Sequence, residues 1–271
     1  MKKITPFFAV ALLAGTSLFF SGCSKKAIEQ FLKHPGKEPE PSCSIQKIIF
    51  QPEAYPVFPI DTLTITYNAA GNPTSAIRKE TNENGPNYYF RYDHLNRLTD
   101  LIGIGDNGFY RSWHRYVYNA SGKVIVDSIY DYPEEMDNHP VTGIVGTVTT
   151  ADYLYDATGR VSKMTINPVD PGDMTVVENY SYDSNGNLTG YTYDSKVNIH
   201  QTNKVWQFLS RDYSVNNPVS GPGLAVSYTY NGYGLPTQVN ATTGSFNLVV
   251  PGNSDRFAFS HGTIIYSCQP W

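Results

Sequence analysis

One stretch of the chain decides its fold: Tyr116-Val117-Tyr118-Asn119-Ala120-Ser121-Gly122-Lys123-Val124-Ile125-Val126. Large apolar residues alternate with others on both sides of a short polar segment. Asn opens a turn by accepting a hydrogen bond from a backbone N–H two residues further on. Gly then adopts the positive φ that closes the turn. Alternation on both sides of such a turn predicts a β-hairpin.

The same pattern recurs six times along the chain, as an aromatic residue, Asn or Asp, two variable residues and Gly. The copies begin at Tyr67, Tyr92, Tyr118, Tyr155, Tyr182 and Tyr230. In the second copy Asn96 replaces the Gly, and Asn is the next residue best able to adopt a positive φ. The copies lie 25, 26, 37, 27 and 48 residues apart, and the shorter spacings fit two strands with two connections.

Six hairpins predict an all-β fold, an antiparallel meander of about twelve strands. A meander of that size must curl or close to protect its edges, so we expect a barrel. Pro73 and Pro236 follow the turn in the first and last copies only. Since Pro is tolerated at the start of a strand or at a sheet edge, we expect these outer hairpins to flank a seam.

The long gap before the last copy carries an insertion near 203–213 whose large side chains do not alternate. We expect a short helix or an irregular lid over the mouth of the barrel. Aromatic faces stack on sugars, and β-barrel mouths hold ligands. Trp206, Phe208 and Tyr213 are therefore candidate ligand contacts, with a glycan or another envelope component as partner. The alternative is that the aromatic side chains only pack against one another.

The N-terminal segment resembles a bacterial lipoprotein signal peptide. Two lysines precede an apolar run over 7–20, which has the length of a signal peptide and is too short to span a membrane. The sequence Phe20-Ser21-Gly22-Cys23 matches the lipobox. This resemblance implies that residues 1–22 are removed and that Cys23 receives the lipid that anchors the chain to a membrane. The alternative is an ordinary secreted protein with a chance cysteine.

Residues 23–42 are polar and rich in Pro, Lys and Glu, a composition that predicts a flexible tether. We expect residues 43–271 to form a single β-barrel-like domain of six hairpin repeats. The lipidated residue is followed by Ser24, Lys25 and Lys26. In Bacteroidetes-type lipoproteins an acidic run at this place is associated with surface exposure. We therefore expect an outer-membrane lipoprotein of the cell envelope that faces the periplasm.

Two further cysteines, Cys43 and Cys268, stand near the two ends of the predicted domain. An exported chain meets an oxidising compartment, so we predict a disulfide between them. Closing so long a loop gains up to about 4–5 kcal/mol in the loop-entropy model. The alternative is a pair of buried free thiols.

The composition argues against nucleic acid as a partner. Without residues 1–22 the chain keeps 18 basic and 24 acidic residues, a net charge of −6. Nucleic-acid-binding domains are basic instead.

Sequence motifs for catalysis or metal binding are missing. None of the six histidines pairs with another at metal-ligand spacing. The GxGxxG match at 103–108 leads into a strand pattern rather than a helix, which predicts a hairpin loop instead of a phosphate site. We therefore expect a protein that is not an enzyme, has a binding or structural role, and carries no cofactor or metal. The alternatives are an outer-membrane-inserted barrel and a glycan-active hydrolase on a β scaffold.

The Tyr-Asn/Asp-x-x-Gly hairpins resemble YD repeats, the units of RHS-type shells, although the core motifs of those shells are missing. Together with the lipobox they resemble a Bacteroidetes lipoprotein family of unknown function with a porin-like β-barrel. The resemblance covers roughly Cys43 to Cys268. It implies a barrel-like fold, and it brings no catalytic residue to this chain.

Overall fold

The structure is a computed structural model that describes residues 42–52, 60–79, 85–143, 146–168, 174–249 and 257–269. The predicted signal peptide, Cys23 and most of the tether lie outside the described residues. Cys43–Ser267 form one compact unit, and Met1–Ser42 with Cys268–Trp271 form the other.

The described residues contain eighteen strands and two short helices. The first nine strands are β1 (Ser42–Pro52), β2 (Asp61–Tyr67), β3 (Pro73–Arg78), β4 (Asn87–Tyr92), β5 (Leu98–Ile104), β6 (Tyr110–Tyr118), β7 (Val124–Asp131), β8 (Glu134–Met136) and β9 (His139–Val141). The others are β10 (Thr147–Tyr155), β11 (Val161–Asn167), β12 (Val176–Asn179), β13 (Thr192–Val197), β14 (Asn216–Gly221), β15 (Leu224–Tyr230), β16 (Pro236–Thr243), β17 (Phe246–Val249) and β18 (Phe257–Gln269). The helices are the 3-10 helix η1 (Ile199–Thr202) and α2 (Lys204–Ser210).

Sixteen of these strands form one sheet, which confirms the all-β, antiparallel meander. The order along it is β12-β11-β10-β7-β6-β5-β4-β3-β2-β1-β18-β16-β15-β14-β13, with β17 paired to β18. Neighbouring strands pair antiparallel, and most neighbours also follow one another in the chain, as β6 and β7 do and β15 and β16 do. The described strands exceed the expected twelve because the segments around the insertion and the β8–β9 hairpin add further ones.

All six predicted turns have the expected hydrogen bonds. In the third, the N–H of Gly122 donates to the carbonyl of Asn119, and Asn119 Oδ1 accepts from the N–H groups of Ser121 and Lys123, both at 3.0 Å. The other five repeat this geometry. Asn96 has φ +59°, as its place in the second turn requires. The GxGxxG segment forms the connection from β5 to β6, as predicted.

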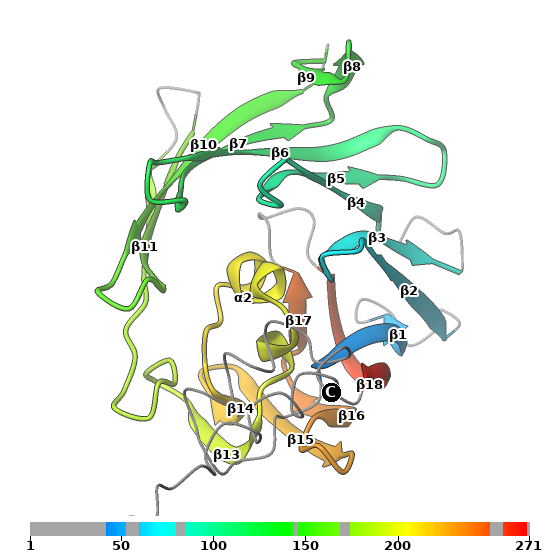
Figure 1. The fold of residues 1–271 in the computed structure, drawn as a ribbon, viewed down its shortest axis with the longest axis vertical. Coiled ribbons are helices and arrows are strands. Elements are labelled where there is room, and N and C mark those ends of the chain that lie inside the picture. Colours follow the sequence, from blue (N-terminus) through cyan, green and yellow to red (C-terminus); the bar gives the residue numbers. More distant parts are fainter. Residues whose placement is uncertain are drawn as a thin grey trace, which may run out of the picture. The chain divides into compact units, whose positions relative to one another are not determined.

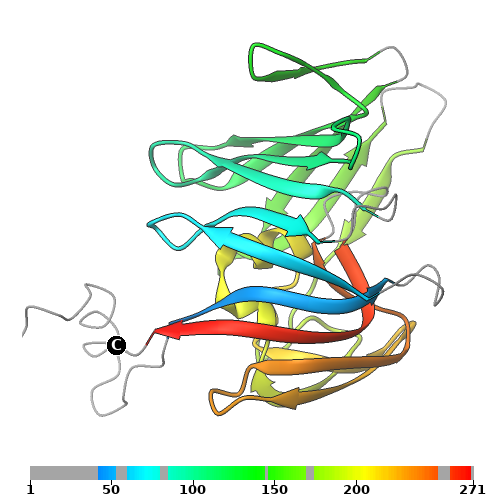
Figure 2. The same ribbon diagram turned by 90° about the vertical axis from the view of Figure 1, so that its right-hand side faces the viewer.

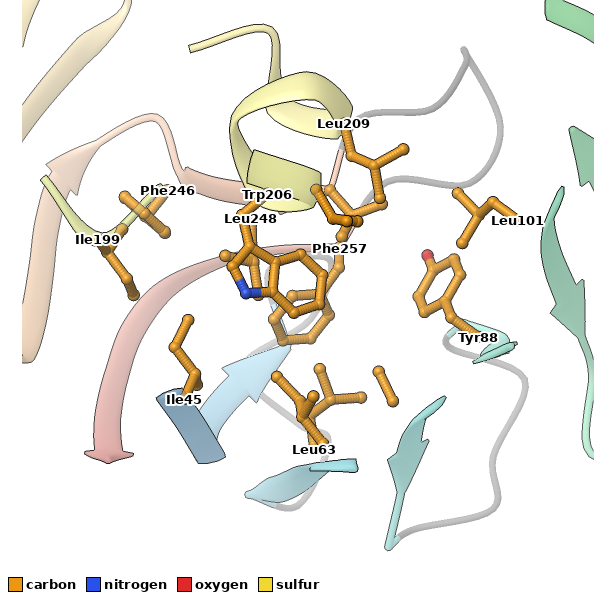
Figure 3. Close-up of a cluster of buried hydrophobic side chains, with 14 of the residues drawn as sticks. Ile45, Leu63, Tyr88, Leu101, Ile199, Trp206, Leu209, Phe246, Leu248 and Phe257 are labelled. Atoms are coloured by element: carbon orange, nitrogen blue, oxygen red, sulfur yellow. The ribbon is translucent and has the colours of Figure 1, made fainter. Parts of the chain in front are cut away.

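The interior of the unit is a packed core built around the insertion. The segment predicted as helix or lid forms η1 and α2, and Figure 1 shows α2 on the concave side of the sheet. The indole of Trp206 is 0% exposed and packs edge-on against Phe90 of β4, with 5.7 Å between ring centroids. Figure 3 shows this ring among side chains from η1, β1, β2, β17 and β18. The insertion therefore fills the interior rather than covering a mouth.

The predicted closure into a barrel is wrong, because the sheet is not closed. Its two ends are β12 and β13, which follow one another in the chain. Between them the fifth turn makes a single isolated bridge, Tyr182 to Leu188. The N–H of Leu188 donates to Ser214 Oγ and the Asn187 amide donates to Asn216. These groups of the fifth turn are therefore hydrogen-bonded to the segment after α2 and to β14, and they do not pair with a further strand of the sheet.

The first and last hairpins flank the junction of the first and last strands, as expected from the two prolines. Pro73 and Pro236 do begin strands, β3 and β16, as predicted. Between these hairpins, β1 and β18 are neighbours in the sheet and lie side by side in Figure 2. These two strands join the first and last hairpins, so the open edges fall near the insertion instead.

Two further observations concern the predicted disulfide and the membrane. Cys43 and Cys268 are both disulfide-bonded, while their pairing with each other stays a prediction. Among the described residues, no helix is both long and apolar enough to cross a membrane.

Candidate functional site

The turn ends of the hairpins form a ladder of tyrosines. In the second, third and fourth copies the repeat tyrosine donates its hydroxyl to the carbonyl two residues past the turn Gly or Asn of the preceding hairpin. Tyr118 Oη donates to the carbonyl of Leu98 at 2.7 Å, and Tyr155 Oη to that of Val124 at 2.9 Å. Tyr92 makes the same bond to Pro73, and Tyr266 of β18, which is not a repeat tyrosine, makes an equivalent bond to Pro236. Burial, followed by the charge of Asp93, raises the pKa of Tyr118 to about 12, so this hydroxyl stays a donor.

A second ladder of basic side chains lies on top of the first. The residue after the turn Gly or Asn is placed over the tyrosine ring of the next hairpin. The guanidinium of Arg97 lies 4.6 Å from the ring centroid of Tyr118, and the Lys123 ammonium lies 5.3 Å from that of Tyr155. Arg160 takes the same position over the next repeat tyrosine, at 3.9 Å. Such cation–π contacts stabilise by roughly 0.5–1 kcal/mol at exposed sites.

Hydrogen bonds fix this basic row in place. Arg97 Nη2 lies 2.6 Å from Asp93 Oδ2, and Arg160 Nη2 lies 2.7 Å from Asp156 Oδ2. Lys123 Nζ donates to the carbonyl of Gly159 at 2.9 Å. The partial burial of Asp156 favours its neutral form, but hydrogen bonds from Arg160 and Thr158 and the charge of Arg160 outweigh this effect. They lower the pKa of Asp156 to about 2.

The insertion forms the opposite wall. Asn203 caps α2 by accepting from the N–H of Val205 at 2.8 Å, and its amide donates to the carbonyl of Gly71 in the first turn, also at 2.8 Å. Gln201 donates to the carbonyls of Tyr213 and Ser214. The insertion is therefore hydrogen-bonded to the first turn through Asn203, and to the segment that follows α2 through Gln201.

Between the two walls lies a cleft of about 580 Å³, which we call the turn cleft. Its described lining comes from the turns of the first five repeats, from η1 and α2, and from the segment that follows α2. Aromatic rings are contributed by Tyr118, Tyr155, Phe208 and Tyr213. Side-chain amides are contributed by Asn72, Asn96, Gln201 and Gln207. Basic groups are contributed by Arg97, Lys123, Arg160 and Lys204.

The chemistry of this lining is one-sided. Among the described lining residues there is no Asp, Glu, His, Cys or Ser. The cleft thus offers stacking surfaces, hydrogen-bond donors and positive charge. It lacks, in the same described set, the pair of carboxylates that glycoside hydrolysis ordinarily uses.

Two of the three residues proposed from the sequence as ligand contacts lie at this cleft. Phe208 and Tyr213 are half-buried and line it. Trp206 instead belongs to the core, because helical geometry turns it toward β4 while its neighbour two residues on faces the cleft. The basic row was missed. Its signal was present in the sequence, as Arg, Lys and Arg after the turn position in three successive copies.

Two buried His–Asp pairs were also missed. His114 Nδ1 lies 2.9 Å from Asp127 Oδ2 between β6 and β7, and His200 Nδ1 lies 3.2 Å from Asp212 Oδ2 inside the insertion. A sequence of scattered histidines and carboxylates gives no sign of such pairs. No group of three or more metal-ligating side chains gathers anywhere in the described part of the chain.

The second pair lines a smaller cavity of about 210 Å³ together with Ser210, a combination that resembles a hydrolase triad. The hydrogen bonds contradict that role. His200 Nε2 faces the carbonyl of Asn247 at 3.0 Å, and Ser210 Oγ donates to the carbonyl of Trp206 at 2.7 Å. Burial raises the pKa of Asp212, but bonds from His200 and Ser214 outweigh burial and leave it lowered. The pair joins η1 to β17 and the end of α2.

The chain matches no protein-family model. It matches no curated protein either. Among solved structures it is similar to a porin-like protein from Bacteroides uniformis, with 13% identity, a TM-score of 0.40, and coverage of 83% of this chain and 98% of that one. It is also similar to the Tc holotoxin pore of Photorhabdus luminescens, with 15% identity, a TM-score of 0.24, and coverage of 65% and 10%. A TcdB2-TccC3 structure gives 16% identity, a TM-score of 0.25, and coverage of 73% and 11%. Likenesses at this level establish neither a shared fold nor a shared function.

Proposed function

We propose that this chain is an exported lipoprotein of the cell envelope that binds a glycan-type ligand in the turn cleft without transforming it. One observation carries the proposal. The turn cleft combines aromatic rings, amides and basic groups, and its described lining contains no Asp, Glu, His, Cys or Ser. Binding sites for small polar ligands have this composition, with apolar walls and a few placed polar groups.

The placement of the aromatic residues supports a sugar as the ligand. Phe208 of α2 and Tyr213 of the segment that follows α2 both line the cleft. Phe208 is held by Tyr116 and Tyr153, with ring centroids 5.3 and 5.4 Å away. A ring fixed by its neighbours loses little conformational entropy when a ligand stacks on it.

Two substitutions of the same kind test the cleft. Val215 lines the cleft and is 48% exposed. Val117 of β6 is exposed to nearly the same extent, 47%, but does not line the cleft. In a glycan-array measurement with the full chain in detergent, we expect Val215→Trp to abolish binding and Val117→Trp to leave it unchanged. Equal loss in both variants, or no binding by the unaltered chain, would contradict the proposal.

The membrane attachment is proposed on the sequence of residues 1–26. Lipid joined to the thiol of Cys23 would hold the β unit on the tether, with the Ser-Lys-Lys sequence that follows it favouring the periplasmic side of the outer membrane. Mass spectrometry of the purified chain should show a polypeptide that begins at Cys23 and carries a diacylglyceryl group. An unmodified Cys23 would contradict this part of the proposal.

A further inference from the structure

The basic row of the turn cleft repeats with the sheet. The second turn joins β4 to β5, the third joins β6 to β7, and the fourth joins β10 to β11, and these strands are consecutive in the sheet order. Successive turns are therefore two strands apart, which is about 9.6 Å at the usual strand spacing. Arg97, Lys123 and Arg160 follow this spacing, so the three basic groups span about 19 Å along the edge by the same spacing.

Part of this positive charge is not compensated within the described structure. Arg97 and Arg160 each form an ion pair with the Asp four residues before them. Lys123 bonds to a carbonyl oxygen, which carries no formal charge. Lys204, at the start of α2, is exposed and forms no ion pair among the described residues. The rest of the mature chain is acidic, so the cleft differs in sign from the protein that surrounds it.

We infer that the turn cleft takes an anionic polysaccharide, a chain of carboxylate-bearing sugars, with a negative charge recurring along it. The inference rests on the proposed function and narrows it to one ligand class. Lys123 and Lys204 face the carboxylates, the two arginines offer remaining N–H donors, and Phe208 and Tyr213 stack on the sugar rings. An acidic peptide would match the charge, but it presents no ring face to the aromatic side chains.

The experiment uses the full chain in detergent and two probes of the same backbone, oligogalacturonate and its methyl ester. Esterification removes the charge and keeps the sugar. We expect oligogalacturonate to bind, its affinity to fall as salt is raised, and the ester to bind at least about tenfold more weakly, the loss of one or two charge-assisted contacts. A disaccharide, which is too short to reach from Arg97 to Arg160, should bind more weakly than a hexasaccharide.

Charge variants locate the effect. Lys204 is exposed, and Lys204→Gln should weaken the binding of oligogalacturonate several-fold and weaken the binding of the ester less. The matched control is Lys163→Gln, because Lys163 lies opposite the exposed Leu154 in the sheet and does not line the cleft. It should leave both affinities unchanged.

Different failures have different meanings. If the ester binds as tightly as the acid, or if salt has no effect, the anionic ligand class is wrong while the glycan-binding function stands. If neither sugar binds but poly-glutamate does, the ligand is an acidic peptide and both the inference and the glycan part of the proposed function are overturned. If none of the three probes binds, both are overturned together.

Discussion

At the scale of single residues, the repeat tyrosine is the part that joins one hairpin to the next. Its ring supports the basic side chain of the preceding turn and its hydroxyl satisfies a carbonyl there. Both contacts come from one residue type in one position. Tyr118 and Tyr155 make both contacts, Tyr92 makes the hydroxyl bond, and Tyr182 makes the ring contact.

Removing one such hydroxyl should destabilise the unit. Tyr118→Phe keeps the ring under Arg97 but deletes the bond to Leu98, leaving a partly buried carbonyl without that donor. We expect the free energy of unfolding to fall by about 1 kcal/mol, measured by urea denaturation at neutral pH. Tyr233→Phe is the control, because Tyr233 is 54% exposed in the sixth turn. An equal effect in the two variants would refute the ladder.

The carboxylate of the fourth turn should make stability depend on pH. The pKa of Asp156 is lowered to about 2 in the folded state. A lowered pKa stabilises the folded state above the unfolded pKa near 4, and this contribution is lost as the pH falls from about 4 to 2. Asp156→Asn keeps the turn bonds, as Asn does in the first, third and sixth copies, and removes the charge. Its cost near pH 7 should be about 0.2–1 kcal/mol, because the pair is partly exposed.

Comparing the two proteins from pH 7 to pH 2 isolates that charge. The difference in unfolding free energy between the unaltered chain and Asp156→Asn should shrink toward zero at low pH. A difference that stays constant over the whole range would mean that Asp156 acts only through its turn geometry.

At this scale the sequence predicts the local contacts and misses the distant ones. Asn119 and its turn bonds lie within five residues, so the motif specifies them. The pairing of His200 with Asp212, or of Lys123 with the ring of Tyr155, depends on strand register and on the course of the insertion. Neither is encoded in a spacing that a single sequence reveals.

At the scale of elements, the turns require a left-handed residue. Gly122 has φ +74°, and a Cβ added there would have no atom within 4 Å. Any cost of substitution is therefore conformational. Gly122→Ala should destabilise by about 1–2 kcal/mol, and Gly122→Asn should cost less, because Asn96 already occupies the equivalent place. Thermal unfolding that ranks Ala equal to or above Asn would contradict this account.

The insertion should be the main source of interior packing. Trp206→Ala removes a fully buried indole from the centre of the core and should cost about 3–5 kcal/mol. Phe109→Ala, on a side chain that is 70% exposed, should stay within about 0.5 kcal/mol. Chemical denaturation of both variants checks the contrast. A loss below 1 kcal/mol for Trp206→Ala would mean that the insertion is a loosely attached lid, as its sequence first indicated.

For residues 203–213, the prediction of a short helix is confirmed, but the prediction that it covers the mouth of a barrel is wrong. The lack of alternation indicated that the segment is not a strand. Whether such a segment covers a mouth or fills an interior depends on how much space the sheet encloses. That depends on curvature, which no residue pattern in the hairpins specifies.

At the scale of the whole β unit, the sheet curls but does not close. We expected a long meander to protect its edges by closing into a barrel. The meander is present, but its edges are not paired with each other. The first and last strands join in the middle of the sheet, and the chain leaves and re-enters the sheet on either side of the insertion. The interior is thereby packed, and the proposed ligand site lies at the row of turns at the rim.

Hydrogen–deuterium exchange of the full chain with and without oligogalacturonate tests this location most directly. We expect slower exchange in the segments around Arg97, Lys123 and Arg160 and over residues 201–215, with exchange unchanged in β16 and β18, which do not line the cleft. Slower exchange confined to residues 199–212, with the three turns unchanged, would place the ligand at the cavity beside His200 and contradict the central claim. Slower exchange confined to β16 and β18 would contradict it too. Unchanged exchange throughout at saturating ligand would contradict it as well.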